Sequence, residues 1–270
     1  MVTDRINALM RRIVRSRLRR ESRGTNVATT AGRSRLRGYG LEMAYPNRLV
    51  WLHQFLEVFD QDRYGVRALP PQARVVDVGA NIGLLALYVM WRHPLARVVA
   101  VEPGAENLRY LRANVGHRAD GRVEVRPVAV ARARGSVVLG GSVSDALRIG
   151  ATQGEPVEAI PLSDLLTEPT DLLKMNIEGA EVEAVAGAGS GMRLVRRAVI
   201  ECHEYRDGRR PLASLIRSLQ DEGFDRFRVV GHQEYDWEDP ALPVHTCLLE
   251  SWRSARGHGE QTVTPGRCEG

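Results

Sequence analysis

The stretch RVVDVGANIG, residues 74–83, decides the fold of this chain. A short apolar run surrounding Asp77 leads into a turn that carries Gly79, Asn81 and Gly83. An apolar helical pattern follows directly and stops at Pro94. A buried strand that enters a helix through a Gly-rich turn is typical of parallel α/β sheets, which bind nucleotides at this point. The stretch therefore predicts a parallel sheet with a ligand site at the turn.

The same alternation of strand and helix patterns continues outward from this stretch. Further helices are predicted at about 47–59, 105–115 and 211–224. Further strands are predicted at 97–103, 122–130, 136–139, 157–162, 171–179, 196–205, 227–232 and 244–252. Strands that alternate with helices favour a mostly parallel sheet with helices on both faces. We therefore expect one α/β domain over residues 41–253, followed by a polar, Gly-containing tail at 254–270 that we expect to be disordered.

The basic charge of the chain is concentrated at its N-terminus. The net charge is +5, but residues 1–40 contribute +9 and the remainder totals −4. Ile6, Leu9, Met10, Ile13, Val14 and Leu18 recur at helical spacing within this basic extension. We interpret it as an amphipathic helix that docks on the body or on a second subunit, so a homo-oligomer is possible. The alternatives are a membrane-surface anchor and an RNA-binding arm. Residues 21–40 are predicted to form a loose connector.

Other compositional signals narrow the class of protein. We find no apolar run long enough to span a bilayer and no secretory signal, and we expect a cytoplasmic protein. The three cysteines show no paired spacing, so neither a disulfide framework nor a cysteine-based zinc site is predicted. A basic surface around the active site is expected of nucleic-acid enzymes, and the body of this chain is acidic. A nucleic-acid partner is therefore not favoured.

The Gly-rich turn differs from the fingerprint of dinucleotide-binding proteins. That fingerprint would place glycines at positions 79, 81 and 84, where this chain has Gly79, Asn81 and Leu84. The actual pattern is Asp77-x-Gly79-x-Asn81-x-Gly83, and Glu102 lies twenty-five residues beyond Asp77, near the interval of a ribose-binding acid.

Together, VVDVGANIGLLAL and VVAVEP resemble the Rossmann-like methyltransferases that bind S-adenosylmethionine. Further motifs, VEAIPLSDLL, DLLKMNIEGAEVEAVAGA and AVIECHEY, resemble those of the FkbM family of methyltransferases, in the same order and over about residues 47–252. The resemblance implies a seven-stranded Rossmann-like methyltransferase fold in which the cofactor is bound by Asp77, Gly79, Asn81, Gly83 and Glu102. It also implies methylation of oxygen on small molecules such as sugars, nucleosides or polyketides in antibiotic-type biosynthesis. Asn176 stands where many members have Asp.

The chain contains a single lysine, Lys174, in the strand predicted beside the first motif. Strand alternation would place it on one face with Asn176 and Glu178, at the carboxyl edge of the sheet. Polar groups on a central strand are costly unless they are paired. We expect Lys174 to support the site by bonding Glu178, Asn176 or nearby carbonyls; an ion pair that only closes the end of the sheet is the alternative.

Methyl transfer to a hydroxyl requires a group that accepts the hydroxyl proton. Glu178, Glu181, Glu201 and His203 are the candidates at this edge, and a neutral His203 is the favoured base because its ordinary pKa is about 6.5. Asn176 and Glu178 could bind a divalent cation, but no metal is indicated. Two other functions stay open: an RNA methyltransferase that uses the Arg-rich extension, and a binding module without catalysis.

Overall fold

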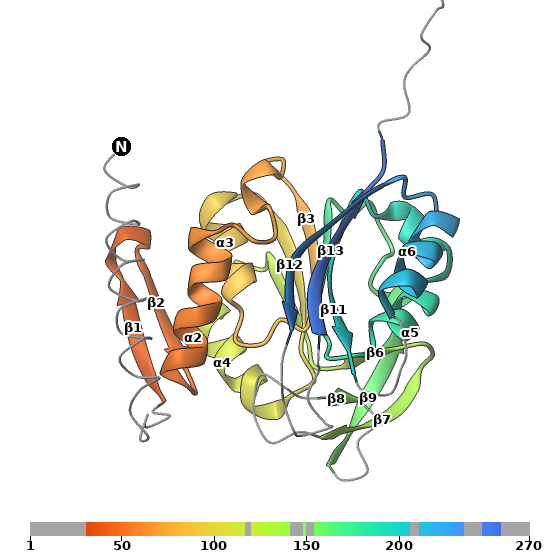
Figure 1. Cartoon of the computed structure of the whole chain (residues 1–270). Helices are drawn as coiled ribbons and strands as arrows, with labels where there is room; N and C mark the ends of the chain where they lie inside the picture. The colour runs from red at the N-terminus through yellow and green to blue at the C-terminus, as the bar shows by residue number, and fades with distance from the viewer. Residues whose placement is uncertain are drawn as a thin grey trace, which may run out of the picture.

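A seven-stranded mixed sheet forms the centre of the molecule, in the order β12-β13-β11-β10-β3-β4-β5 (Figure 1). The computed structural model describes residues 31–116, 120–140, 148–149, 154–205, 211–234 and 245–254. The sheet strands are β3 (Arg74–Val78), β4 (Arg97–Val101), β5 (Val123–Arg126), β10 (Leu172–Met175), β11 (Arg197–Glu204), β12 (Arg226–Glu234) and β13 (His245–Trp252). The pairs from β11 to β5 are parallel, and β13 runs antiparallel to both of its neighbours. The predicted mostly parallel, Rossmann-like sheet is confirmed.

Helices cover both faces of this sheet (Figure 1). The helices are α2 (Arg48–Phe55), α3 (Leu84–Arg92), α4 (Ala105–Val115), α5 (Glu181–Ala186) and α6 (Pro211–Asp221), and a π-helix, η2 (Leu56–Asp60), continues α2. Short 3₁₀ turns lie at Arg37–Tyr39, Val66–Ala68, Leu162–Asp164 and Gly189–Leu194. One core cluster packs α2, α3 and α4 on the first face, and a second packs α5 and α6 on the other.

The central strands are apolar because they are covered on both sides. Leu172, Leu173 and Met175 of β10 are fully buried. Burial of each such side chain stabilises the fold by about 1.5–3 kcal/mol before conformational entropy is subtracted. Lys174 is the exception on this strand, and it is also buried.

A second, four-stranded sheet lies near the carboxyl end of β11, below it in Figure 1. Its strands are β6 (Ala129–Ala131), β7 (Gly135–Gly140), β8 (Arg148–Ile149) and β9 (Glu155–Pro161). The sequence predicts one strand over 122–130, but the structure divides it between β5 and β6, which belong to different sheets. Pro127 lies between the two pieces and has no N–H group to donate to a sheet ladder, so the division falls there.

An antiparallel hairpin of β1 (Gly32–Leu36) and β2 (Leu41–Tyr45) precedes α2. The loose connector predicted for 21–40 is therefore wrong in the part that is described, since β1 pairs with β2 along its length. Leu36, Met43 and Tyr45 join the first core cluster, which explains why this segment is ordered. The helix predicted from Ile6 to Leu18 and residues 255–270 of the predicted tail lie outside the described residues.

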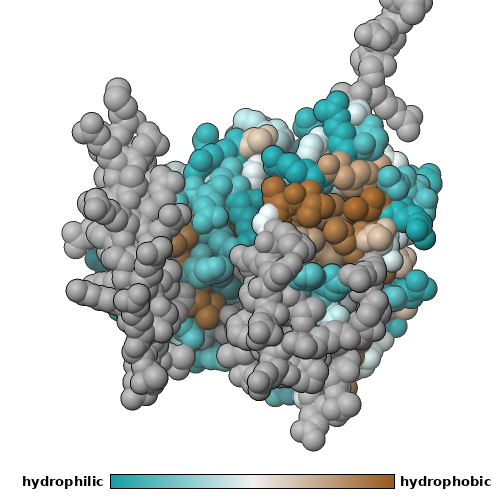
Figure 2. All heavy atoms as spheres, in the orientation of Figure 1, coloured by the Kyte–Doolittle hydropathy of each residue, from teal (hydrophilic) through white to brown (hydrophobic). Residues whose placement is uncertain are grey.

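The strand β12 lies at the edge of the central sheet and carries Val229, which is 44% exposed. Figure 2 shows an apolar patch in the region where Figure 1 draws β12 and β13. Among the described residues, no helix is long and apolar enough to cross a membrane.

Candidate active site

A cavity of about 490 Å³ opens at the carboxyl ends of β3, β4, β10 and β11. Ligands bind at this edge in open α/β sheets, at the point where the strand order reverses, and here the chain runs from β3 to β4 on one side and has β10 on the other. Eight of the eleven residues that the sequence singles out line the cavity: Asp77, Gly79, Asn81, Glu102, Lys174, Asn176, Glu178 and Glu201. The other three, Gly83, Glu181 and His203, are not among the lining residues.

The Gly-rich turn forms one wall of the cavity through a run of left-handed backbone. Gly79, Asn81 and Gly83 have φ angles of 77°, 50° and 87°. A Cβ atom on Gly79 would lie 1.9 Å from the backbone oxygen of Asn176, so the turn and the end of β10 approach too closely for any side chain. A Cβ on Gly83 would lie 2.6 Å from Leu111. Gly83 therefore serves the packing of the turn against α4.

Glu102 follows β4 and is held in place by the turn itself. Its carboxylate accepts hydrogen bonds from the backbone N–H groups of Asn81 and Gly104, both at 2.9 Å, and from the Asn107 amide at 3.3 Å. Burial raises the pKa of Glu102, although these hydrogen bonds act in the opposite direction. The side chain of Asn81 accepts from the N–H of Ile82 at 2.8 Å, which stabilises the turn locally.

Lys174 supports the turn from the neighbouring strand. Its ammonium donates to the Gly79 carbonyl at 2.6 Å and lies 3.0 Å from Oδ1 of Asp77. Both side chains are buried, and Oδ2 of Asp77 has no hydrogen-bond partner among the described residues. The expected supporting role therefore uses partners on β3 and its turn. Glu178 and Asn176, which the sequence also offers as partners, are not bonded to Lys174 by any contact that we find in the described residues.

A polar array on the opposite side of the cavity is centred on Glu201 of β11. Its carboxylate accepts from the Asn176 amide at 3.0 Å and from the Arg63 guanidinium at 3.0 Å. Arg63 also forms an ion pair with Glu57 of η2. Burial of Arg63 opposes its charge, but Glu201 and Glu57 outweigh burial and raise its pKa. Oδ1 of Asn176 is buried without a hydrogen-bond partner in the described residues.

Glu178 lies between these two sides with an unusual backbone. Its φ angle is 55°, a left-handed conformation that is uncommon for a residue other than glycine. The Tyr205 hydroxyl donates to its carbonyl at 2.9 Å, and Gly179 follows with a φ angle of 98°. Strained backbone of this kind occurs disproportionately at functional sites.

His203 does not fit the role of a neutral base. It is buried behind the cavity lining, with Nδ1 2.8 Å from Glu181 and Nε2 3.5 Å from Glu178. Burial alone would lower its pKa, but the two carboxylates outweigh burial and raise the pKa to about 10. The imidazole is therefore already protonated near neutral pH. Glu181 is fully buried and does not line the cavity.

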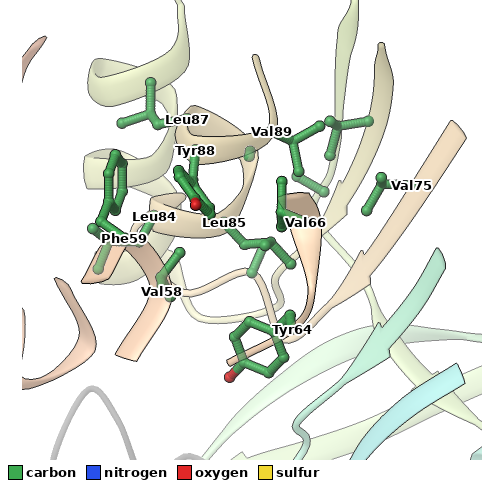
Figure 3. Close-up of a cluster of buried hydrophobic side chains, with 14 of the residues drawn as sticks. Val58, Phe59, Tyr64, Val66, Val75, Leu84, Leu85, Leu87, Tyr88 and Val89 are labelled. Atoms are coloured by element: carbon green, nitrogen blue, oxygen red, sulfur yellow. The ribbon is translucent and has the colours of Figure 1, made fainter. Parts of the chain in front are cut away.

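The segment before β3 also lines the cavity, which the sequence did not predict. Arg63 and Glu57 line the cavity together with Tyr64, whose ring centre lies 5.7 Å from the Lys174 ammonium. Figure 3 shows Tyr64 at the edge of a buried cluster, with its hydroxyl oxygen pointing away from the cluster. No local pattern distinguishes Arg63 from the other arginines of the chain. The π-helical turn at Glu57 is of a kind frequent at functional sites, and it is visible only in the structure.

The charges that line the cavity are mainly negative. Five carboxylates, Glu57, Asp77, Glu102, Glu178 and Glu201, face two cations, Arg63 and Lys174. Within the described residues, no group of three or more His, Cys, Asp or Glu side chains is arranged to hold a metal ion. The divalent cation that the sequence left open at Asn176 and Glu178 therefore gains no support.

The chain is similar to known proteins over most of the segments that line this cavity. Residues 77–226 match the sequence profile of the "Methyltransferase FkbM domain". The chain is 30% identical over 201 residues to the 31-O-demethyl-FK506 methyltransferase FkbM of Streptomyces tacrolimicus, covering 60% of this chain and 76% of that protein. It is 29% identical over 213 residues to the methyltransferase sdnD of Sordaria araneosa, covering 63% of this chain and 81% of the relative.

Two further matches cover only part of the other protein. The chain is 33% identical over 199 residues to the AMB antimetabolite synthetase AmbE of Pseudomonas aeruginosa, covering 56% of this chain but 9% of the synthetase. The solved structure of the methyltransferase FkbM from Methylobacillus flagellatus is 19% identical, with a TM-score of 0.48, covering 73% of this chain and 47% of that one.

Proposed function

The chain belongs to the FkbM methyltransferase family and is an S-adenosylmethionine-dependent methyltransferase, and we propose that it methylates a hydroxyl group of a small molecule. The proposal rests on one observation, that two sides of different chemistry line the same cavity. A Gly-rich turn with Glu102 forms one side, and carboxylates and an amide at the ends of β10 and β11 form the other.

The residues around the turn fit the cofactor. Oδ2 of Asp77 is a buried acceptor without a partner in the described part of the chain, and it suits the ammonium group of the amino-acid end. Glu102 is fixed by backbone N–H groups and has remaining acceptor capacity for the ribose hydroxyls. Val101, Val128 and Leu139 supply apolar walls suited to the adenine ring.

The charges of the lining favour a neutral acceptor. The cavity has an excess of carboxylates, which attracts a cationic sulfonium and repels an anionic group brought close to it. Carboxylates also accept hydrogen bonds from hydroxyl groups. A hydroxyl is therefore favoured over a carboxylate as the group that is methylated, and the lining would also repel the polyanionic backbone of an RNA substrate.

We assign Glu178 as the group that accepts the hydroxyl proton. S-adenosylmethionine, when bound, supplies an electrophilic methyl group, so this chain has only to orient the acceptor and remove a proton. The strained backbone of Glu178 aims its side chain at the cavity, and the protonated His203 faces its carboxylate at 3.5 Å. Glu201 and Asn176 would orient the hydroxyl by hydrogen bonds, while Arg63 fixes the carboxylate of Glu201.

The relatives support a place in secondary metabolism. The Streptomyces protein is named for methylation at an oxygen of FK506, and the Pseudomonas protein for synthesis of an antimetabolite. We propose that the acceptor is likewise a hydroxylated secondary metabolite, such as a sugar, nucleoside or polyketide.

A labelled-methyl assay tests the proposal. The protein is incubated with methyl-labelled S-adenosylmethionine and a panel of hydroxylated, carboxylic-acid and amine compounds, and the products are identified by mass spectrometry. We expect label on hydroxyl oxygen, and none with the Glu178→Gln variant. Transfer to carboxylic acids or amines instead would overturn the assignment of a hydroxyl acceptor.

A further inference from the structure

A second cavity, of about 460 Å³, lies against the acceptor side of the first. The two share His53, Glu57 and Arg63 as lining residues. Beyond these, the second cavity is lined by Leu56 of η2, by Gln61 and Asp62 after it, and by residues of the two strands at the sheet edge: Arg228, Val230, Gly231, Leu248 and Glu250. The cofactor side, at Glu102, takes no part in it. The second cavity therefore extends the site away from the cofactor.

One rung of the sheet passes from the first cavity into the second. Glu201 of β11 pairs with Leu248 of β13, and Leu248 pairs with Val230 of β12. Residues paired across neighbouring strands point to the same face of a sheet. Glu201 lines the first cavity, and Leu248 and Val230 line the second. A ligand that contacts Glu201 can thus continue along this rung past Leu248, which is buried, to Val230, which is partly buried.

The first cavity has the size of a site for one drug-sized ligand. Pockets of about 300–1,000 Å³ bind one such ligand, and 490 Å³ falls in the lower half of that range. S-adenosylmethionine, itself a drug-sized molecule, would therefore fill much of it. The adjoining second cavity offers about 460 Å³ for the part of the acceptor beyond its reacting hydroxyl.

The ion pair of Glu57 and Arg63 belongs to the lining that the two cavities share. Glu57 belongs to the π-helix η2, and such turns are rare and occur frequently at functional sites. Arg63 reaches from this pair to Glu201, so the shared lining and the polar array of the first cavity form one network. In the second cavity, Arg228 shares a single carboxylate, that of Glu250, with Arg197. The guanidinium of Arg228 therefore has donors to spare.

We propose that the second cavity is the distal subsite for an elongated acceptor, and this rests on the methyl transfer proposed above. The acceptor's hydroxyl lies beside Glu178 and Glu201, and an aliphatic segment attached to it extends over Leu248 and Val230. A carbonyl or similar hydrogen-bond acceptor on its far end meets Arg228. The chemical class is a hydroxylated aliphatic chain or macrocycle, rather than a single free sugar ring.

Linear diols of increasing length provide the probe. Butanediol, hexanediol and octanediol, each with a hydroxyl at both ends, are titrated by NMR into the full-length protein saturated with S-adenosylhomocysteine. Each methylene that enters the second cavity should tighten binding by roughly fourfold at most. The variant Val230→Trp, which places a large ring in the cavity, should remove this dependence on length.

The matched control is Val229→Trp on the same strand. Val229 is exposed, and its partner Leu249 belongs to the core cluster of the opposite face, so the control alters neither cavity. The control should keep the dependence on length, and a Val230→Lys variant should lose it like Val230→Trp. S-adenosylhomocysteine affinity and the urea midpoint of each variant report whether it is folded.

Two failures are distinguishable. If the wild-type protein binds S-adenosylhomocysteine but holds all three diols equally, or if Val230→Trp keeps the dependence on length, the distal subsite is overturned and the proposed methyl transfer stands. If S-adenosylhomocysteine itself does not bind, the proposed function is overturned and this inference with it.

Discussion

On the cofactor side of the cavity, Glu102 accepts hydrogen bonds from Asn81 and Gly104, twenty-one and two positions away in the chain. On the acceptor side, Glu201 is held by Arg63, which is 138 positions away, and by Asn176. Backbone groups of two strand-to-helix connections, one after β3 and one after β4, therefore position the cofactor-side acid, whereas side chains from distant segments position the acceptor-side acid. The first arrangement is fixed once these two connections form, and the second can vary with each distant residue.

This contrast separates the two sides of the proposed site. Changes at Arg63, Glu57 or the sheet edge can alter the proposed acceptor side while the Gly-rich turn stays intact. Mutations should therefore separate cofactor affinity from turnover, depending on which side they affect.

The largest effect is expected for Glu178→Gln. Removal of the proposed proton acceptor should lower turnover by about 10²–10⁴-fold, because general-base catalysis contributes by this factor. Single-turnover assays measure the rate, and calorimetry should find the S-adenosylmethionine affinity unchanged. Glu204→Gln is the control, since Glu204 pairs with His245 and does not line the cavity. An active Glu178→Gln enzyme would transfer the role to Glu201.

Arg63→Met tests the acceptor side through its effect on the stability of the fold. The substitution leaves the carboxylates of Glu57 and Glu201 without their shared cation. Loss of one partner from a fully buried ion pair costs about 3–5 kcal/mol. Because these side chains keep 14–17% exposure, we expect the free energy of unfolding to fall by about 2–4 kcal/mol.

Urea denaturation measures this change against a surface control. Arg132→Met breaks a pair with Glu183 in which both side chains are mostly exposed, and exposed pairs contribute about 0–1 kcal/mol. Equal losses of stability in the two variants would mean that Arg63 does not organise the acceptor side.

Glu102→Ala should weaken the cofactor side alone. Loss of hydrogen bonds to a charged group should reduce S-adenosylmethionine affinity by about 1.5–3 kcal/mol in calorimetry. Glu124→Ala, on the exposed part of the neighbouring strand β5, is the control and should bind normally. Unchanged affinity in Glu102→Ala would show that the cofactor does not use this acid.

The last prediction concerns His203 and the dependence of stability on pH. Its pKa is raised to about 10 in the folded protein, against an ordinary value of about 6.5 in the unfolded chain. The stabilisation from its proton is therefore complete below about pH 6.5 and is lost as the pH rises toward 10. The slope is at most about 1.4 kcal/mol per pH unit.

Urea midpoints measured from pH 6 to 10 should fall in the wild-type protein and fall less in His203→Gln. In mild acid, protonation of His203 should not reduce wild-type turnover, because the imidazole is already charged. Equal pH slopes for the two proteins would show that the folded pKa of His203 is not raised.

Much of the fold could be predicted because it depends on local pattern. The apolar runs of β3, β4, β10 and β11 and the turn at Gly79 were all visible in the sequence, since burial on both faces demands continuous apolar residues. The division of residues 122–130 into β5 and β6 was not visible in the sequence, because the sheet that a strand joins depends on long-range pairing. The strand β1 was missed because its sequence, GRSRL, resembles a connector.

The site divides in the same way. The motif residues Asp77, Asn81 and Glu102 line the cavity as expected, and Lys174 supports the turn. The role of His203 could not be read from its position at the end of a strand, because a pKa depends on neighbours brought in by folding. Here Glu181 and Glu178 surround the ring and keep it charged.

By itself, the sequence determined the central sheet, the Gly-rich turn and the acids that we expect to face the cofactor, because each depends on residues adjacent in the chain or on strand periodicity. Only the tertiary structure decided that Arg63 and Glu57 join Glu201, that two carboxylates lie against His203 and raise its pKa, and that a second cavity lined by Leu248 adjoins the first. These features arise from side chains of distant segments that meet only when the sheet and its helices pack, and no local pattern encodes such meetings.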